Sequence, residues 1–282
     1  MKLLRVGPAG EERPCVLAPD GRVLDLSSLT ADIDGAFLRS GGVERVRSAL
    51  DAGLLPEAGT HERVGAPVAR PGKIVCIGLN YSDHAEETGA ALPAEPVVFM
   101  KASNTLVGPD DEVLVPRRSQ KTDYEVELAV VIGRTARYLD SPEEAADVIA
   151  GYAIANDVSE REFQNERGGQ WDKGKSCETF NPLGPWLVTA DEVGDPQALG
   201  LRLWVNGELR QNGNTKNQIF GVHHVIWYLS QFMVLEAGDV VNTGTPAGVA
   251  LGRGPGAYLR EGDVVELEID GLGRQRQRMG QA

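Results

Sequence analysis

Cysteine and histidine are scarce in this sequence. Its 282 residues include three cysteines, Cys15, Cys76 and Cys177, and four histidines. The cysteines are scattered and lack the CxxC spacing of a zinc site, so they indicate reduced thiols of a cytoplasmic protein, not a disulfide framework. A metal site built mainly from histidine or cysteine is therefore not expected.

Long apolar runs and an excess of basic residues are also missing. No apolar stretch of the sequence approaches the roughly 18 residues of a membrane span. The formal net charge is −13 and the pI is about 4.8, which disfavours nucleic acid or an anionic membrane as a partner. The first residues, MKLLRVGPAGEERP, are interrupted too soon for a signal peptide. We expect a cytoplasmic protein, in which one local positive site could still bind an anionic substrate.

The distribution of elements predicts two units, residues 1–66 and residues 67–282. In the first unit, KLLRV and RVLDL are typical of short strands, and residues 43–50 are typical of a helix. Prolines and glycines in residues 64–73 indicate a linker. Strands dominate the second unit, with a few helices between them. This pattern favours a mixed β architecture with some α.

Three segments of the second unit carry clear local signals. Ser141 with Glu144, and Ser159 with Glu162, have the spacing of a capping box and predict helices that begin at the two serines. Asn206-Gly207 lies between two apolar runs and predicts a hairpin turn.

Three carboxylates alternate with other residues in DYEVE, which precedes the apolar run LAVVIG. In a strand, side chains alternate between faces, so Asp123, Glu125 and Glu127 are expected on one face. A half-buried strand with a solvated face would explain the pattern. However, the residues that follow are apolar on both faces, which indicates a strand that enters a core. Acids at such a position need a partner, and a cation is one.

Asp157 ends the predicted strand GYAIAND, just as Glu125 and Glu127 begin theirs. Two glutamates and one aspartate offer three oxygen ligands, which suit Mg²⁺ or Mn²⁺ and leave positions for water and substrate. Zinc is disfavoured because no histidine or thiolate accompanies the acids. Asp123 shares the face of the glutamates, and spacing alone leaves it as a rival ligand.

A possible general base lies in NYSDHAEE, where His84 and Glu87 are three residues apart. On a short helix the two side chains would share a face, and a carboxylate beside an imidazole raises its basicity toward water. The alternative is a solvated helix with a chance histidine.

Two further segments could contact an anion. Lys175 lies between Gly174 and Ser176, as a fixed cation for an anionic group often does, although an ordinary surface lysine would also fit. The surrounding GQWDKGKS has phosphate-loop spacing but lacks the strand before it and the helix after it, so we reject that interpretation. NTGTPAG offers hydroxyls and backbone N–H groups for a carboxylate, or forms a plain turn.

In this order, the motifs resemble the fumarylacetoacetate hydrolase superfamily over about residues 70–282. The matching segments are GLNYSDHAEE, VVFMKASNTLVGP, DYEVELAVVIG, NDVSEREFQ, WDKGKS and TGTPAGV. They are especially similar to a bacterial branch that includes hydrolases of 2,4-diketo-3-deoxy sugar acids and proteins labelled ureidoglycolate lyase. The resemblance implies a β-sandwich roll as the catalytic domain, preceded by a small N-terminal α+β domain, in a homodimer.

The resemblance also implies roles for individual residues. The family's metal ligands are matched by Glu125, Glu127 and Asp157, with Mg²⁺ or Mn²⁺ as the implied cofactor. Its catalytic residues are matched by His84, Glu87 and Lys175. Its substrate-binding residues are matched by Arg161, Gln164 and Thr245. This assignment favours the glutamates and Asp157 over Asp123 as ligands.

The implied activity is catabolic hydrolysis of a carbon–carbon bond in a 2,4-dioxo acid, either an acylpyruvate, a fumarylacetoacetate-like compound or a 2,4-diketo-3-deoxy sugar acid. The same site could instead serve a 2-oxo diacid decarboxylase, a 2-hydroxydienoate isomerase or a ureidoglycolate lyase. A non-catalytic metal-binding module is the remaining class, and the joint presence of His84, Glu87 and Lys175 argues against it. The motifs describe the shared head of the substrate and leave its tail, the pathway and the choice between Mg²⁺ and Mn²⁺ open.

Overall fold

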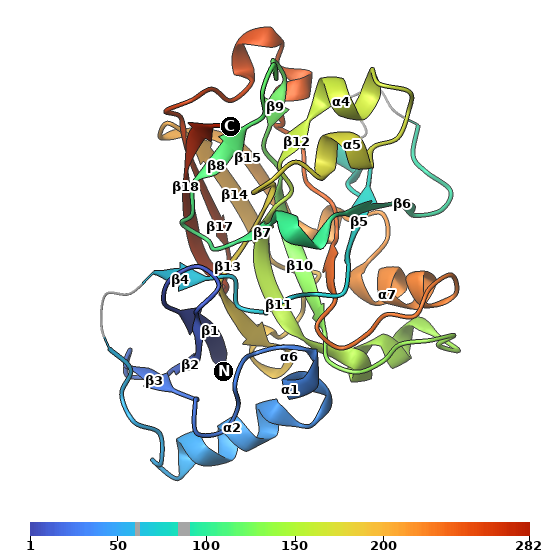
Figure 1. Ribbon diagram of the computed structural model, residues 1–282. Coiled ribbons are helices and arrows are strands. Elements are labelled where there is room, and N and C mark those ends of the chain that lie inside the picture. The colour runs from blue at the N-terminus through green and yellow to red at the C-terminus, as the bar shows by residue number, and fades with distance from the viewer. Residues whose placement is uncertain (60–62, 84–90) are drawn as a thin grey trace.

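Two β-sheets form the body of the protein in the computed structural model, which describes residues 1–59, 63–83 and 91–282 (Figure 1). The larger sheet has 11 strands. From edge to edge it consists of β3 (Val23–Asp25), β2 (Arg13–Leu17), β1 (Lys2–Val6), β13 (Asn181–Thr189), β11 (Ile149–Asn156), β10 (Val126–Ile132), β16 (Val240–Asn242), β5 (Ile74–Gly78) and β6 (Val97–Lys101), with β4 (Val64–Gly65) beside β1 and β7 (Leu106–Val107) beside β13.

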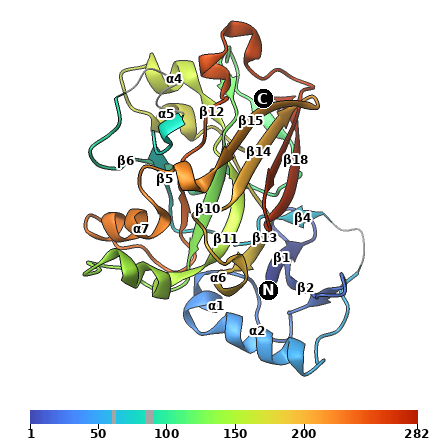
Figure 2. The same cartoon turned by 180° about the vertical axis from the view of Figure 1, so that it is seen from behind.

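The smaller sheet lies against β10, β11 and β13 (Figure 2). Its five strands are, in order, β15 (Glu208–Asn214), β14 (Gly200–Val205), β17 (Val264–Ile269), β18 (Gly273–Gln281) and β8 (Val113–Val115). The hairpin between β14 and β15 turns at Asn206 and Gly207, whose φ angles of 52° and 80° are those of a type I′ turn. The predicted turn is therefore confirmed.

The core between the sheets is apolar. Leu128, Val130 and Ile132 of β10 are fully buried there with Leu203 of β14 and Val265 of β17. Burial of each such side chain contributes about 1.5–3 kcal/mol. Every residue of β10 is buried, as the apolar run on both of its faces predicts. The expected mixed β sandwich with some α is confirmed.

The first 66 residues extend the larger sheet. Strand β1 pairs antiparallel with β13, with Leu3 opposite Leu187, and helices α1 (Gly35–Arg39) and α2 (Gly42–Asp51) pack below it in Figure 1. Their core includes Phe37 together with Leu187 and Val131 of the larger sheet. The boundary between units at residue 66 stays a prediction.

Short helices complete the fold, and two of them border the end of β10 where the acidic residues lie. They are α4 (Arg161–Asn165) and α5 (Asp172–Lys175). The other helical segments are α6 (Ala190–Val193), α7 (Val222–Ser230), η1 (Ser103–Thr105), η2 (Pro142–Val148), η3 (Thr215–Asn217), η4 (Ala250–Gly252) and η5 (Pro255–Ala257). Across the described ranges, none of the helices has the length and apolar character needed to cross a membrane.

Neither predicted capping box forms. The helix start predicted at Ser141 is present, since Ser141 is the N-cap residue of the 3₁₀ segment η2 with Pro142 in its first turn, but its side chain makes no capping hydrogen bond. Ser159 lies in the two-residue strand β12 (Ser159–Glu160), which pairs with β9 (Thr122–Asp123). Helix α4 is capped instead by Glu160, whose carboxylate accepts a hydrogen bond of 3.1 Å from the N–H of Glu162. Tertiary strand pairing has overridden the local capping signal at Ser159.

Candidate functional site

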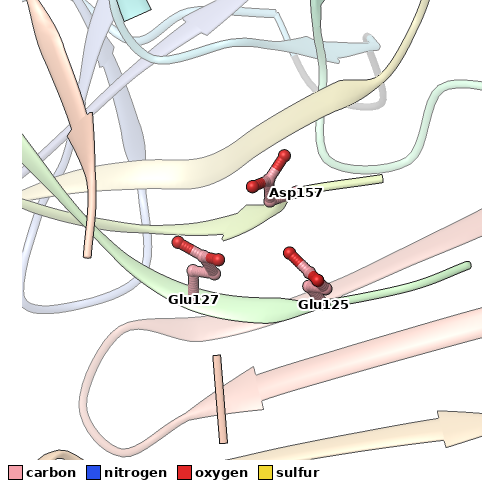
Figure 3. Close-up of side chains that lie close together, drawn as sticks. All are labelled: Glu125, Glu127 and Asp157. Atoms are coloured by element: carbon pink, nitrogen blue, oxygen red, sulfur yellow. The ribbon is translucent and has the colours of Figure 1, made fainter. Parts of the chain in front are cut away.

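Three carboxylates meet at one end of β10 and β11. Glu125 directly precedes β10, Glu127 lies within it, and Asp157 directly follows β11. The two strands are antiparallel, with Val126 opposite Asn156, so the chain delivers all three acids to the same place (Figure 3). One oxygen of each carboxylate lies within 4.8 Å of the others, and all three residues are buried.

Asp123, the rival ligand, lies outside this group. One of its carboxylate oxygens accepts a hydrogen bond of 2.8 Å from Arg161 Nε and one of 3.0 Å from the N–H of Leu251. The other oxygen accepts from the N–H of Ala250 at 2.8 Å. These contacts use Asp123 to hold Arg161 and the start of η4 in position, so the structure separates it from the three candidate ligands.

Two buried lysines contact the carboxylates. Lys175 Nζ donates to Glu125 at 2.7 Å and to Asp157 at 2.8 Å. Lys101 Nζ donates to the other oxygen of Asp157 and, at 3.0 Å, to the carbonyl of Val158. The side chains of Lys101 and Lys175 are 0% and 2% exposed. These ion pairs stabilise the buried lysines and carboxylates, because a buried charge without a partner is costly.

Glu125 and Glu127 differ in their surroundings. Burial acts to raise the pKa of Glu125, but the charges of Lys175 and Arg161 outweigh it and lower that pKa to about 2. Arg161 Nη2 donates to Glu125 at 2.6 Å. Burial and the charges of Asp157 and Glu125 raise the pKa of Glu127. Among the described residues, no lysine or arginine forms an ion pair with Glu127, which accepts a 2.7 Å hydrogen bond from the N–H of Gly244.

The group fits a hard divalent cation. All of its candidate ligand atoms are carboxylate oxygens, which Mg²⁺ and Mn²⁺ prefer. A carboxylate offers about four lone-pair positions, so the hydrogen bonds to Glu125 and Asp157 leave capacity for a cation. Glu127 would gain the positive partner that the described residues do not give it.

A cavity of about 190 Å³ adjoins the carboxylates. The expected substrate-binding residues Arg161, Gln164 and Thr245 line it together with Lys175, Glu125 and Glu127. The rest of its wall consists of Ile77, Gly78, Leu79, Phe99, Asn165, Trp171 and Leu251. The structure therefore brings together all the predicted site residues that it describes, and the roles assigned to them remain predictions.

The loop that carries Thr245 is fixed by its neighbours. Thr245 Oγ1 donates to the carbonyl of Val126 at 2.9 Å and accepts from Gln211 Nε2 at 2.8 Å. Gly244 has a φ of 99°, and a Cβ at this position would lie 2.8 Å from Cβ of Asn80. Glycine is required here by both the backbone conformation and the close approach.

His84 and Glu87, the predicted general base and its partner, lie outside the described residues. Their assignment rests on the sequence motif alone.

Lys101 and the aromatic pair of the cavity, Phe99 and Trp171, were not predicted from the sequence. Lys101 ends the strand sequence VVFMK, where a lysine after an apolar run is the only available signal. Phe99, two residues earlier, packs edge-on against Trp171, with ring centroids 5.4 Å apart. The Lys175 ammonium lies 5.0 Å from the centroid of the Phe99 ring. The pattern GQWDKGKS contains Trp171, but nothing in it indicates a pocket wall.

The sequence is similar to known proteins over most of its length. Residues 73–279 match the family model described as fumarylacetoacetate (FAA) hydrolase C-terminal. A protein of Burkholderia multivorans, whose name describes it provisionally as a hydrolase, is 53% identical over 278 residues, or 98% of each chain.

Several solved structures match the whole length of this chain, including the following three. Fumarylacetoacetate hydrolase from Exiguobacterium antarcticum has a TM-score of 0.87 and 37% identity, with 100% of each chain covered. Maleylpyruvate hydrolase from Sphingobium sp. SYK-6, solved with manganese(II) and pyruvate, has a TM-score of 0.82 and 30% identity, with 100% of each chain covered. A probable 2-hydroxyhepta-2,4-diene-1,7-dioate isomerase from Mycobacterium abscessus has a TM-score of 0.82 and 33% identity, with 99% of that chain covered.

Proposed function

Because the chain belongs to the fumarylacetoacetate hydrolase family, we propose that it is a divalent-metal-dependent hydrolase that cleaves a carbon–carbon bond in a 2,4-dioxo acid. The observation that carries the proposal is the buried group of Glu125, Glu127 and Asp157 beside the cavity that Lys175 lines. The maleylpyruvate hydrolase solved with manganese(II) and pyruvate supports it, because pyruvate contains the oxo-acid head shared by such substrates.

In this proposal, Glu125, Glu127 and Asp157 would hold Mg²⁺ or Mn²⁺, which would supply a Lewis acid to the oxo-acid head of the substrate. Arg161 uses three of its five N–H donors on Asp123, Glu125 and Gln164. The other two can bind the substrate's carboxylate. Thr245 borders the same cavity, and its hydroxyl would donate to that carboxylate after turning away from the carbonyl of Val126.

The bond cleavage needs a base and a stabilised leaving group. We assign His84 to removing a proton from water, with Glu87 orienting its imidazole, a contribution of roughly 10²–10⁴-fold. The oxygen of that water adds to the C4 carbonyl, and the C3–C4 bond then breaks. C3 takes up a proton, so the products are pyruvate and a second carboxylic acid. The Lys175 ammonium stabilises the negative charge on the enolate oxygen before C3 is protonated.

Isomerisation of a 2-hydroxydienoate is the second candidate. It is favoured by the structural similarity to the Mycobacterium abscessus isomerase, and it requires proton transfer within the same oxo-acid head without water addition. Decarboxylation of a 2-oxo diacid and cleavage of ureidoglycolate are less well supported, since none of the comparisons above carries either name. We further propose that the protein acts in catabolism as a cytoplasmic homodimer on a small anionic oxo acid.

An assay of reaction products tests the proposed function. The purified protein with Mn²⁺ or Mg²⁺ is incubated with acylpyruvates, oxaloacetate, a 2-hydroxydienoate and ureidoglycolate. We expect loss of the dioxo absorbance with release of one pyruvate for each acylpyruvate consumed, and no reaction in EDTA. Consumption of oxaloacetate, the dienoate or ureidoglycolate with acylpyruvates left intact would replace the proposal by decarboxylase, isomerase or lyase activity.

A further inference from the structure

Apart from the residues assigned to the head of the substrate, the described wall of the cavity is mostly apolar. It includes Ile77, Leu79, Phe99, Trp171 and Leu251. From this wall we infer that the substrate is a monocarboxylic 2,4-dioxo acid with a short alkyl tail, and neither a diacid nor a polyhydroxylated sugar acid. The inference rests on the proposed function and specifies the group attached to C4.

The cations that line the cavity are already committed to the head of the substrate. Lys175 contacts Glu125 and Asp157, and Arg161 contacts Asp123 and Glu125. The described lining offers no other lysine or arginine. Residues 84–90, HAEETGA, contain neither residue type in their sequence. A carboxylate at the end of the tail would therefore lose water against the apolar wall without gaining a lysine or arginine as partner, which is unfavourable.

Hydroxyl groups on the tail would also find few partners among the described residues. Beyond the head-binding residues, the described part of the lining offers one polar side chain, that of Asn165. A buried hydroxyl without a hydrogen bond weakens binding. An alkyl tail instead strengthens binding with each CH₂ group that it buries against the wall. The same wall thus penalises charged and polyhydroxylated tails while it favours apolar ones.

The aromatic part of this wall is held in place. A Cβ at Gly78 would lie 2.4 Å from Cζ3 of Trp171, so glycine is what allows the indole to pack on β5. Trp171 also packs edge-on against Phe99, whose Cε1 would lie 3.6 Å from the same Cβ. The wall is therefore built into the fold and not formed by freely moving side chains. This chain differs in its inferred preference from neighbours named for diacids, such as maleylpyruvate.

Binding of a matched pair of 2-oxo acids tests the inferred preference for an alkyl tail without requiring turnover. Both 2-oxohexanoate and 2-oxoadipate have six carbons, and they differ only in the terminal carboxylate. Titration calorimetry with the Mn²⁺-loaded protein should give a dissociation constant at least about tenfold lower for 2-oxohexanoate, which corresponds to 1.4 kcal/mol. Equal binding, or tighter binding of 2-oxoadipate, would overturn the inference whether or not the protein hydrolyses dioxo acids.

Turnover provides a second test. We expect kcat/KM to be at least about tenfold higher for 2,4-dioxoheptanoate than for 2,4-dioxoheptanedioate or a 2,4-diketo-3-deoxy hexonate. Higher kcat/KM for either of the latter would overturn the tail inference while leaving the proposed hydrolase intact. If none of these acids is turned over, the proposed hydrolase activity is contradicted. The comparison of 2-oxohexanoate and 2-oxoadipate binding would then still test the inference about the tail.

A single substitution should reverse the preference. Leu251 is 40% exposed, and its backbone N–H contacts Asp123 regardless of the side chain. Leu251→Lys should improve binding of 2-oxoadipate relative to 2-oxohexanoate by at least about tenfold. Leu209→Lys, on an exposed position of β15 outside the cavity lining, is the matched control and should leave the ratio unchanged. A folded Leu251→Lys protein with the wild-type ratio would contradict the assignment of this wall to the tail.

Discussion

Replacing Glu127 with glutamine should abolish both hydrolysis and stabilisation by metal, without weakening the metal-free protein. Glutamine has the shape of the protonated acid, which the raised pKa of Glu127 favours when no metal is bound. Its side-chain oxygen can still accept from the N–H of Gly244. We therefore expect a melting temperature in EDTA equal to or above that of the wild type.

Added metal should stabilise the wild type but not Glu127→Gln. A ligand at 100 times its dissociation constant stabilises the wild type by about 2.7 kcal/mol, and this gain should disappear in Glu127→Gln. Metal affinity should fall by about 100-fold or more, because loss of partners beyond the direct ligands already costs 10–100-fold. Glu261→Gln, at an exposed position, is the control. A Glu127→Gln protein that keeps the wild-type metal shift would remove Glu127 from the ligand set.

Lys175→Met should have the opposite effect on stability. Without the ammonium, Glu125 and Asp157 lose the cation that they share, although Arg161 and Lys101 remain beside them. Removing one partner of a buried ionic group typically costs about 3–5 kcal/mol, so the melting temperature in EDTA should fall. Mn²⁺ should restore more stability than it adds to the wild type, because the added cation replaces the missing charge.

The activity of Lys175→Met should fall by about 10²–10³-fold even at saturating metal, as expected when a group that stabilises developing charge is removed. Lys173→Met is a close control, since Lys173 is exposed and donates only to the carbonyl of Arg167 in the described structure. Thermal melts and steady-state kinetics on both variants measure the two effects. Normal turnover by a Lys175→Met protein would return Lys175 to a purely structural role.

The acidic strand could be predicted from the sequence because its signals are local. Alternation in DYEVE fixes which side chains share a face, and the apolar residues after Glu127 indicate burial on both sides. Alternation could not decide between Asp123 and Asp157. That decision depends on the N–H groups of Ala250 and Leu251, which reach Asp123 from more than 120 positions along the chain.

Other features could not be predicted from the local sequence, because they depend on contacts between distant segments. Lys101 contacts Asp157, 56 residues away, and the end of β6 gives no sign of that partner. Ser159 has the sequence context of a helix cap, but its segment forms a short strand that pairs with β9. The attachment of β1 to β13 joins chain segments about 185 positions apart, a contact that only the folded chain specifies.

The position of the metal tests the central claim most directly. Crystals grown with Mn²⁺ and pyruvate, measured at the manganese absorption edge, would locate the ion by its anomalous scattering. We expect one strong peak among the carboxylates of Glu125, Glu127 and Asp157, and no such peak in crystals of Glu127→Gln. A peak elsewhere on the protein, or none at saturating Mn²⁺, would contradict the account.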